Sequence, residues 1–175
     1  MIGSAVAARL IDGGYRVVGV DNLGSTSQPL LTEYRLRALR ESDRFEFQAS
    51  DVSDRDAVAG LFRTRSQTGS PPFSAVLNLA ARVGVRQSLI DPHGYYATNL
   101  GGTLLLLEAC RRHDVGKFVL ASTSSVYGAA AGDDPSNFVA VSESAATDRP
   151  LSPYAASKLA AEGLCHAYHH LYGTD

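Results

Sequence analysis

The sequence is poor in cysteine, has no excess of basic residues and has no long hydrophobic run. Its two cysteines, Cys110 and Cys165, are too few for a disulfide framework. Both lie in apolar segments with helical spacing, which favours reduced, buried thiols. The formal net charge of −2 gives no electrostatic case for binding nucleic acid or an anionic membrane. No apolar run approaches the roughly 20 residues that cross a bilayer, and a signal-peptide pattern is absent. We therefore predict a cytoplasmic protein without nucleic-acid or membrane partners.

A metal site is not indicated either. The residues Cys165, His166, His169 and His170 have spacings that bring ligands together on a helix. No second cluster of ligands accompanies them, so we predict that the protein binds no metal.

Short apolar strands alternate with helices along the chain. Helices are predicted over residues 2–12, 29–40, 54–63, 93–113 and 153–172. Strands are predicted over residues 15–20, 45–49, 75–79 and 117–121. The strands lack the polar alternation of a half-exposed sheet, which favours a parallel sheet covered on both faces, as in a doubly wound α/β fold. Residues 128–147 have few large apolar side chains and are predicted to form a surface loop. With 175 residues, the chain is predicted to be one domain, residues 1–175.

A carboxylate ends the first predicted strand, where dinucleotide folds bind adenosine ribose. Asp21 follows Gly3 at about the spacing expected of a residue that binds ribose hydroxyls. Its charge would repel the extra phosphate of NADP, so NAD is the preferred cofactor. Alternatively, Asp21 caps a turn. A dinucleotide loop has three glycines, and only Gly3 is present here, in the place of the last.

A tyrosine and a lysine lie four residues apart in the last predicted helix. Tyr154 and Lys158 would share one helix face. An ammonium near a phenol favours the phenolate, which can act as a base. A run of hydroxyl residues, Ser122 to Ser125, follows the strand that precedes this helix, as expected of an active-site rim. Alternatively, the spacing is a coincidence and the hydroxyl run is only a loop.

Taken together, seven short motifs resemble the extended short-chain dehydrogenase/reductase family of nucleotide-sugar epimerases and dehydratases. In chain order they are Ile2-Gly3-Ser4, Val20-Asp21-Asn22-Leu23, Asp51-Val52, Leu79-Ala80-Ala81, Asn99-Leu100-Gly101-Gly102, Ala121 to Gly128 and Tyr154 to Lys158. The resemblance implies a Rossmann domain that binds NAD. The residues implied to bind it are Gly3, Asp21, Asn22, Asp51, Val52, Leu79, Ala80, Ala81, Asn99, Ser122, Tyr154 and Lys158. Asn99 would orient backbone near the active-site strand or be merely structural.

The resemblance also implies a catalytic mechanism. Tyr154, as phenolate, would take the proton of the sugar 4-hydroxyl while hydride passes from C4 to the nicotinamide. Thr123 would hydrogen-bond the reacting oxygen, and Lys158 would support the phenolate and hold the nicotinamide ribose. The 4-keto sugar would then turn over in the site and receive the hydride on its other face.

The segment from Arg82 to Ser88 most resembles the UDP-glucuronate 4-epimerase branch, which implies Arg86 and Ser88 as substrate-binding residues, along with Thr123 and Tyr154. In related dehydratases an acidic pair follows the catalytic threonine, whereas Ser124 and Ser125 stand there in this sequence. Dehydration is therefore disfavoured. The two serines would help to hold the sugar carboxylate, or would be rim hydroxyls that contact solvent.

Against this family the sequence is expected to be incomplete at both ends. The first strand of the Rossmann domain and the C-terminal substrate domain are not found, so a gap is expected in the middle of the sheet. Other possible functions are a UDP-glucose or N-acetylhexosamine 4-epimerase, a decarboxylating uronate enzyme, a noncatalytic nucleotide-binding protein and an inactive fragment. The family also suggests a homodimer built from the helices at 93–113 and 153–172.

Overall fold

The computed structural model describes residues 2–24, 29–66, 72–131 and 140–175. Its α-helices are α1 (Ile2–Asp12), α2 (Pro29–Arg40), α3 (Arg55–Arg63), α4 (Val85–Ile90), α5 (Pro92–Tyr95), α6 (Gly102–Arg112) and α7 (Pro153–Tyr172). The π-helix η2 (Tyr96–Gly101) joins α5 to α6, and the 3-10 helix η3 (Ser124–Ala131) follows the last strand. The strands are β1 (Val17–Asp21), β2 (Phe45–Ala49), β3 (Val76–Asn78) and β4 (Phe118–Leu120).

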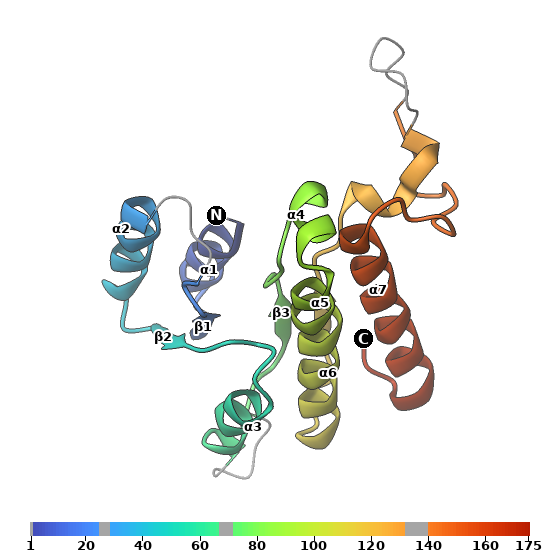
Figure 1. Ribbon diagram of the computed structural model, residues 1–175. Coiled ribbons are helices and arrows are strands. Elements are labelled where there is room, and N and C mark those ends of the chain that lie inside the picture. Colours follow the sequence, from blue (N-terminus) through green and yellow to red (C-terminus); the bar gives the residue numbers. More distant parts are fainter. Residues whose placement is uncertain (1, 25–28, 67–71, 132–139) are drawn as a thin grey trace.

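The strands form two separate parallel pairs. In one pair β1 lies beside β2, with Val17 opposite Phe45, and in the other β3 lies beside β4, with Val76 opposite Phe118. Figure 1 shows β1, β2, α1 and α2 on one side of the molecule and β3 with α4 to α7 on the other. The predicted interruption of the sheet is therefore present among the described residues. Parallel pairing places the carboxyl ends of the strands in each pair at the same edge.

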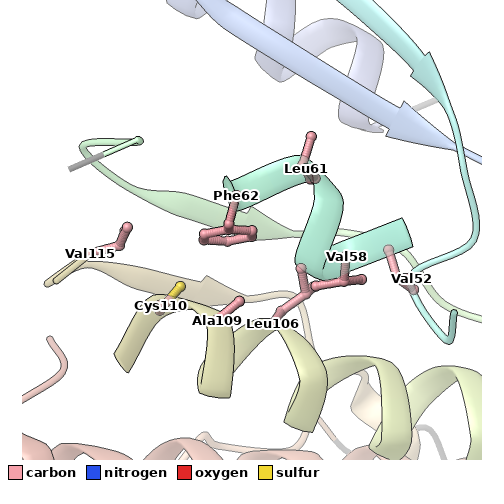
Figure 2. Packing of buried hydrophobic residues seen from close by; sticks show 8 residues of the cluster. All are labelled: Val52, Val58, Leu61, Phe62, Leu106, Ala109, Cys110 and Val115. Atoms are coloured by element: carbon pink, nitrogen blue, oxygen red, sulfur yellow. The ribbon is translucent and has the colours of Figure 1, made fainter. Parts of the chain in front are cut away.

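One apolar core joins the two pairs of strands. Helices α3 and α6 bring together the side chains shown in Figure 2: Val52, Val58, Leu61, Phe62, Leu106, Ala109, Cys110 and Val115. Val18 and Val20 of β1 pack on this cluster, as do Val76 of β3 and Phe118 of β4. The ring of Phe62 is fully buried. Burial of apolar surface against α3 and α6 therefore holds the two halves together.

The longest predicted helix is divided by a π turn. Residues 92–112 are helical without a break, in agreement with the expected segment at 93–113, but residues 96–101 have π geometry. Single π turns inside helices are often found at functional sites. Two short helices, α4 and η3, were not predicted, and η3 occupies the start of the expected loop at 128–147. Residues 132–139 of that loop lie outside the described residues.

The last residues add to the second pair of strands. Asp175 donates its N–H to the carbonyl of Gly116 at 2.8 Å, and its carbonyl accepts from Phe118 N–H at 2.7 Å. This is the pattern of a parallel bridge, which places Asp175 beside the start of β4. No helix among the described residues is long and apolar enough to cross a membrane.

Candidate active site

The start of α7 positions the tyrosine and lysine of the expected catalytic pair. The hydroxyl of Ser152 accepts from Ala155 N–H at 3.1 Å, and Pro153 occupies the first turn. Both are typical of a helix N-terminus. Tyr154 and Lys158 follow on one face of the helix and are 8% and 2% exposed. A cation that is almost completely buried in this way is rare without a counter-charge.

The charge of Lys158 is subject to opposing effects. Burial lowers the pKa of Lys158, while the nearby Glu162 carboxylate and Cys165 raise it. Cys165 is only partly buried, contrary to the prediction of a buried thiol, and its pKa is raised mainly by desolvation. Cys110, by contrast, is fully buried. Neither cysteine forms a disulfide.

The hydroxyl run follows the carboxyl end of β4, and its last two residues, Ser124 and Ser125, begin η3. Thr123 Oγ1 accepts from Ser125 N–H at 3.2 Å and donates to Ser125 Oγ at 3.3 Å. Ser122 donates a hydrogen bond to the Glu162 carboxylate of α7. Gly128 fixes the far side of the run, since a Cβ there would lie 2.2 Å from the Arg149 carbonyl. Residues 122–128 are thereby held against α7 and the segment that precedes it.

Asn99 in the π turn connects the loop after β3 to α7. Its Oδ1 accepts from Arg82 N–H at 2.8 Å, and its Nδ2 donates to the Arg82 carbonyl at 3.0 Å and to Ser157 Oγ at 3.0 Å. Ser157 in turn donates to the Tyr154 carbonyl at 2.7 Å. Both Asn99 and Ser157 are buried, at 1% and 0% exposure. The amide therefore ties the backbone of Arg82 to α7 at Ser157, between the tyrosine and the lysine.

Tyr95 packs against Tyr154 from α5. The two rings form an edge-on pair with centroids 6.0 Å apart. Tyr95 OH donates to the Val83 carbonyl at 2.6 Å, and the guanidinium of Arg82 lies over the Tyr95 ring at 5.2 Å. Burial raises the pKa of Tyr95. These contacts fix Tyr95 as the wall against which Tyr154 lies, a role that the sequence did not reveal.

A second set of polar groups lies at the carboxyl ends of β1 and β2. Asp21 accepts from Leu23 N–H at 2.8 Å, and Asn22 Nδ2 donates to Asp51 at 2.7 Å. Hydrogen bonds from the side chain and backbone of Ser53, and one from Asn22, lower the pKa of Asp51. The carboxylate of Asp21 is therefore tied into a turn through one oxygen, and its other oxygen retains acceptor capacity. Both roles considered for Asp21 are compatible with this geometry.

These groups suit a dinucleotide. The carboxylates of Asp21 and Asp51 lie at one edge of the first sheet, and a Cβ at Gly3 would come only to 3.9 Å from Leu79 Cδ1, at the end of β3. The first turn of α1 is thus beside the loop that contains Ala80 and Ala81. Asn78 Oδ1, on β3, is buried and has no hydrogen-bond partner among the described residues. Acceptors for ribose hydroxyls, the first turn of α1 beside the loop after β3 and a buried ammonium fit an adenine dinucleotide.

The chain is similar to known proteins over nearly its whole length. The model of the NAD dependent epimerase/dehydratase family matches residues 1–175. The chain belongs to this family. A UDP-glucuronate 4-epimerase from Thermodesulfobacterium geofontis is 44% identical over 174 residues, which are 99% of this chain and 50% of the relative. The motif-based recognition and the Rossmann fold class are therefore confirmed.

Solved structures of the family agree. The UDP-glucuronic acid 4-epimerase from Bacillus cereus in complex with UDP-glucuronic acid and NAD has a TM-score of 0.80 and 34% identity, over 98% of this chain and 50% of that chain. The UDP-Glc/GlcNAc 4-epimerase from Campylobacter jejuni has a TM-score of 0.81 and 28% identity, over 99% and 47%. The chain spans about half the length of the relatives it matches.

Two residues expected to bind the substrate of this epimerase family lie in α4. Ser88 is fully buried and donates to the Val85 carbonyl at 2.6 Å, so its hydroxyl serves the helix in this structure. Arg86 is exposed. The structure gathers Asn99, Thr123 and Ser125 around α7, which carries Tyr154 and Lys158. Among the described side chains, no hydrogen bond joins Ser88 to this group. The sequence does not indicate whether the hydroxyl of a serine within a helix bonds to the helix backbone or to another segment.

No group of histidine, cysteine or acidic side chains that could hold a metal ion is present among the described residues. In particular, His169 Nδ1 is hydrogen-bonded to the Thr174 carbonyl at 2.9 Å. This contact ties the end of α7 to the residues that follow it.

Proposed function

We propose that the protein is an NAD-dependent epimerase of a nucleotide sugar and that it inverts C4 of UDP-glucuronate. The observation that carries this proposal is the arrangement around α7: Tyr154 and the buried Lys158 share a helix face, and the adjoining run from Ser122 to Ser125 contains hydroxyls and no carboxylate. A base is therefore present, whereas the acidic pair that an elimination would use is not.

Each residue has a definite task in this proposal. Tyr154 takes the proton of the sugar 4-hydroxyl, and Lys158 favours the phenolate form by its charge. Thr123 hydrogen-bonds the reacting oxygen, and for this its hydroxyl turns away from Ser125 Oγ. NAD, when bound, would supply the reversible hydride acceptor that these side chains lack. Tyr95 and Asn99 limit the movement of Tyr154 from two sides.

Substrate choice is assigned to the hydroxyl run. Ser124 is exposed and Ser125 is half-buried, and the hydroxyl of each can donate a hydrogen bond to a sugar carboxylate. The relatives named for UDP-glucuronate support this choice. We also propose that Asp21 binds the adenosine ribose and that the protein acts as a homodimer through α6 and α7.

The test uses the protein expressed from its complete gene. Purified protein is incubated with UDP-glucuronate, UDP-glucose or UDP-N-acetylglucosamine, and the sugar products are identified by NMR. We expect UDP-galacturonate from the first substrate, with its carboxylate intact. Turnover of UDP-glucose alone would refute the uronate assignment. Loss of carbon dioxide would show a decarboxylase, and absence of turnover with tight NAD binding would show a noncatalytic binder.

A further inference from the structure

Glu162 lies next to the proposed catalytic residues without a role in the chemistry. It follows Lys158 by four residues on α7, so the two side chains share a helix face. It also accepts a hydrogen bond from Ser122, which lies just past the end of β4. Two segments that are 40 residues apart in sequence thus meet at this carboxylate.

A buried ammonium needs such a partner. Lys158 is 2% exposed, and desolvation favours loss of its proton. Among the described residues, the side chains whose charge acts on Lys158 are Glu162 and Cys165, both on α7. Cys165 has a raised pKa, so at neutral pH it is a thiol without charge. The carboxylate of Glu162, one helical turn from Lys158 on α7, is therefore the negative charge that acts on this ammonium.

Titratable groups on the neighbouring elements have other partners. Tyr95 of α5 lies against Tyr154, and Glu108 of α6 binds Tyr168 and Arg111. None of these groups supplies Lys158 with a negative charge.

We propose that Glu162 is a positioning residue that keeps Lys158 in its ammonium form, with its carboxylate oriented toward the lysine by the Ser122 hydroxyl. The significance for catalysis rests on the proposed function, because a charged Lys158 is what supports the Tyr154 phenolate. Glu162 itself touches no reacting atom. It acts through Lys158.

The sequence offers a direct measurement of this charge. Lys117 and Lys158 are the two lysines of the 175-residue chain. Lysine labelled with 13C at Cε therefore gives two resonances, and a Lys117→Arg variant assigns them. Lys117 has a 58% exposed side chain and an ion pair with Asp175, so it is an internal reference for pH and folding. The titration needs neither NAD nor substrate.

Replacement of Glu162 separates its charge from its hydrogen bond. Glu162→Gln retains an oxygen that can accept from Ser122 but loses the charge, so the pKa of Lys158 should fall by about one unit or more. Glu162→Asp keeps the charge and should restore most of that loss. Ser122→Ala should shift the pKa of Lys158 in the same direction by a smaller amount. The matched control is Glu33→Gln on α2, which removes an exposed carboxylate far along the chain.

The proposal is overturned if the pKa of Lys158 in Glu162→Gln lies within about 0.2 units of its wild-type value. Removal of a nearby charge is expected to change the pKa by far more than that. Equal titration in Ser122→Ala and the wild type would overturn the orienting role of Ser122. In protein from the complete gene, the alkaline limb of the pH–rate profile should move to lower pH in Glu162→Gln. A shifted Lys158 titration in a protein without epimerase activity would refute the proposed function and leave this inference standing.

Discussion

Asn99 and Ser157 are joined by a hydrogen bond of 3.0 Å between Asn99 Nδ2 and Ser157 Oγ, although 58 residues separate them in the sequence. The same amide also pairs with both backbone groups of Arg82. Because Ser157 lies between Tyr154 and Lys158 on α7, this amide ties the helix of the proposed catalytic pair to the loop after β3. The π turn at η2 is the element that places the amide there.

We predict that Asn99→Ala destabilises the protein by about 2 kcal/mol or more, because it leaves buried polar groups at Arg82 and Ser157 without partners. Urea unfolding at pH 7 measures the loss. Asn22→Ala is the control: Asn22 is exposed, and its side chain donates to Asp51 and accepts from Gly24 N–H at the surface. Its replacement should cost about 0.5 kcal/mol or less. Equal destabilisation by the two variants would contradict the structural role of Asn99.

Replacement of Tyr154 tests the proposed base. Tyr154→Phe keeps the ring that packs on Tyr95 but removes the hydroxyl, so we expect turnover to fall by about a thousandfold while NAD binding persists. Calorimetry with NAD and a steady-state assay of the complete gene product measure the two effects. The exposed Tyr15→Phe should leave both unchanged. Retention of more than a few per cent of the rate in Tyr154→Phe would remove Tyr154 from the mechanism.

Local signals made α7 predictable, whereas contacts between distant segments did not. The bounds of this helix are indicated in the sequence by Ser152 and Pro153 at its start and by Gly173 at its end. In the structure Gly173 has a φ of 70°, which glycine adopts readily. Tyr154 and Lys158 follow from their spacing on that helix. The π turn has no comparable signal in the sequence, because the side-chain amide of Asn99 within it bonds to Arg82 and Ser157, which lie far along the chain. Tyr95 was missed for the same reason. Glu162 has a local signal, its spacing of four residues from Lys158, but its contact with Ser122 joins distant segments.

The close approach of α6 to the loop after β2 gives a stability prediction. A Cβ at Gly102 would lie 2.9 Å from Val52 Cγ2 and 3.3 Å from the Val52 carbonyl oxygen. Gly102→Ala should therefore destabilise the protein by about 1–3 kcal/mol through overpacking. The control is Gly163→Ala on α7, where a Cβ meets nothing within 4 Å.

Gly163→Ala should instead stabilise the protein by about 0.5–1 kcal/mol, because alanine favours the helix more than glycine does. Thermal unfolding of both variants gives the comparison. A higher melting temperature for Gly102→Ala than for the wild type would show that α6 does not pack on Val52 as described.

The contact between α6 and α7 predicts how stability depends on acid. Hydrogen bonds from Arg111 and Tyr168 lower the pKa of Glu108 to about 2, against an ordinary value of 4.5. A carboxyl whose pKa is depressed by folding stabilises the protein above its unfolded pKa. This contribution is complete above about pH 5 and should be lost progressively as the pH falls toward 2.

Urea unfolding of the wild type and Glu108→Gln at several pH values between 2 and 7 isolates this contribution. The difference in unfolding free energy between the two should be largest at neutral pH and should shrink as the pH falls through the range between the two pKa values of Glu108, because the wild-type carboxyl then takes up its proton on unfolding. Glu33→Gln, on an exposed face of α2, should show a much flatter difference. A Glu108→Gln difference that does not vary with pH would mean that the hydrogen bonds from Arg111 and Tyr168 do not hold Glu108 in its charged form.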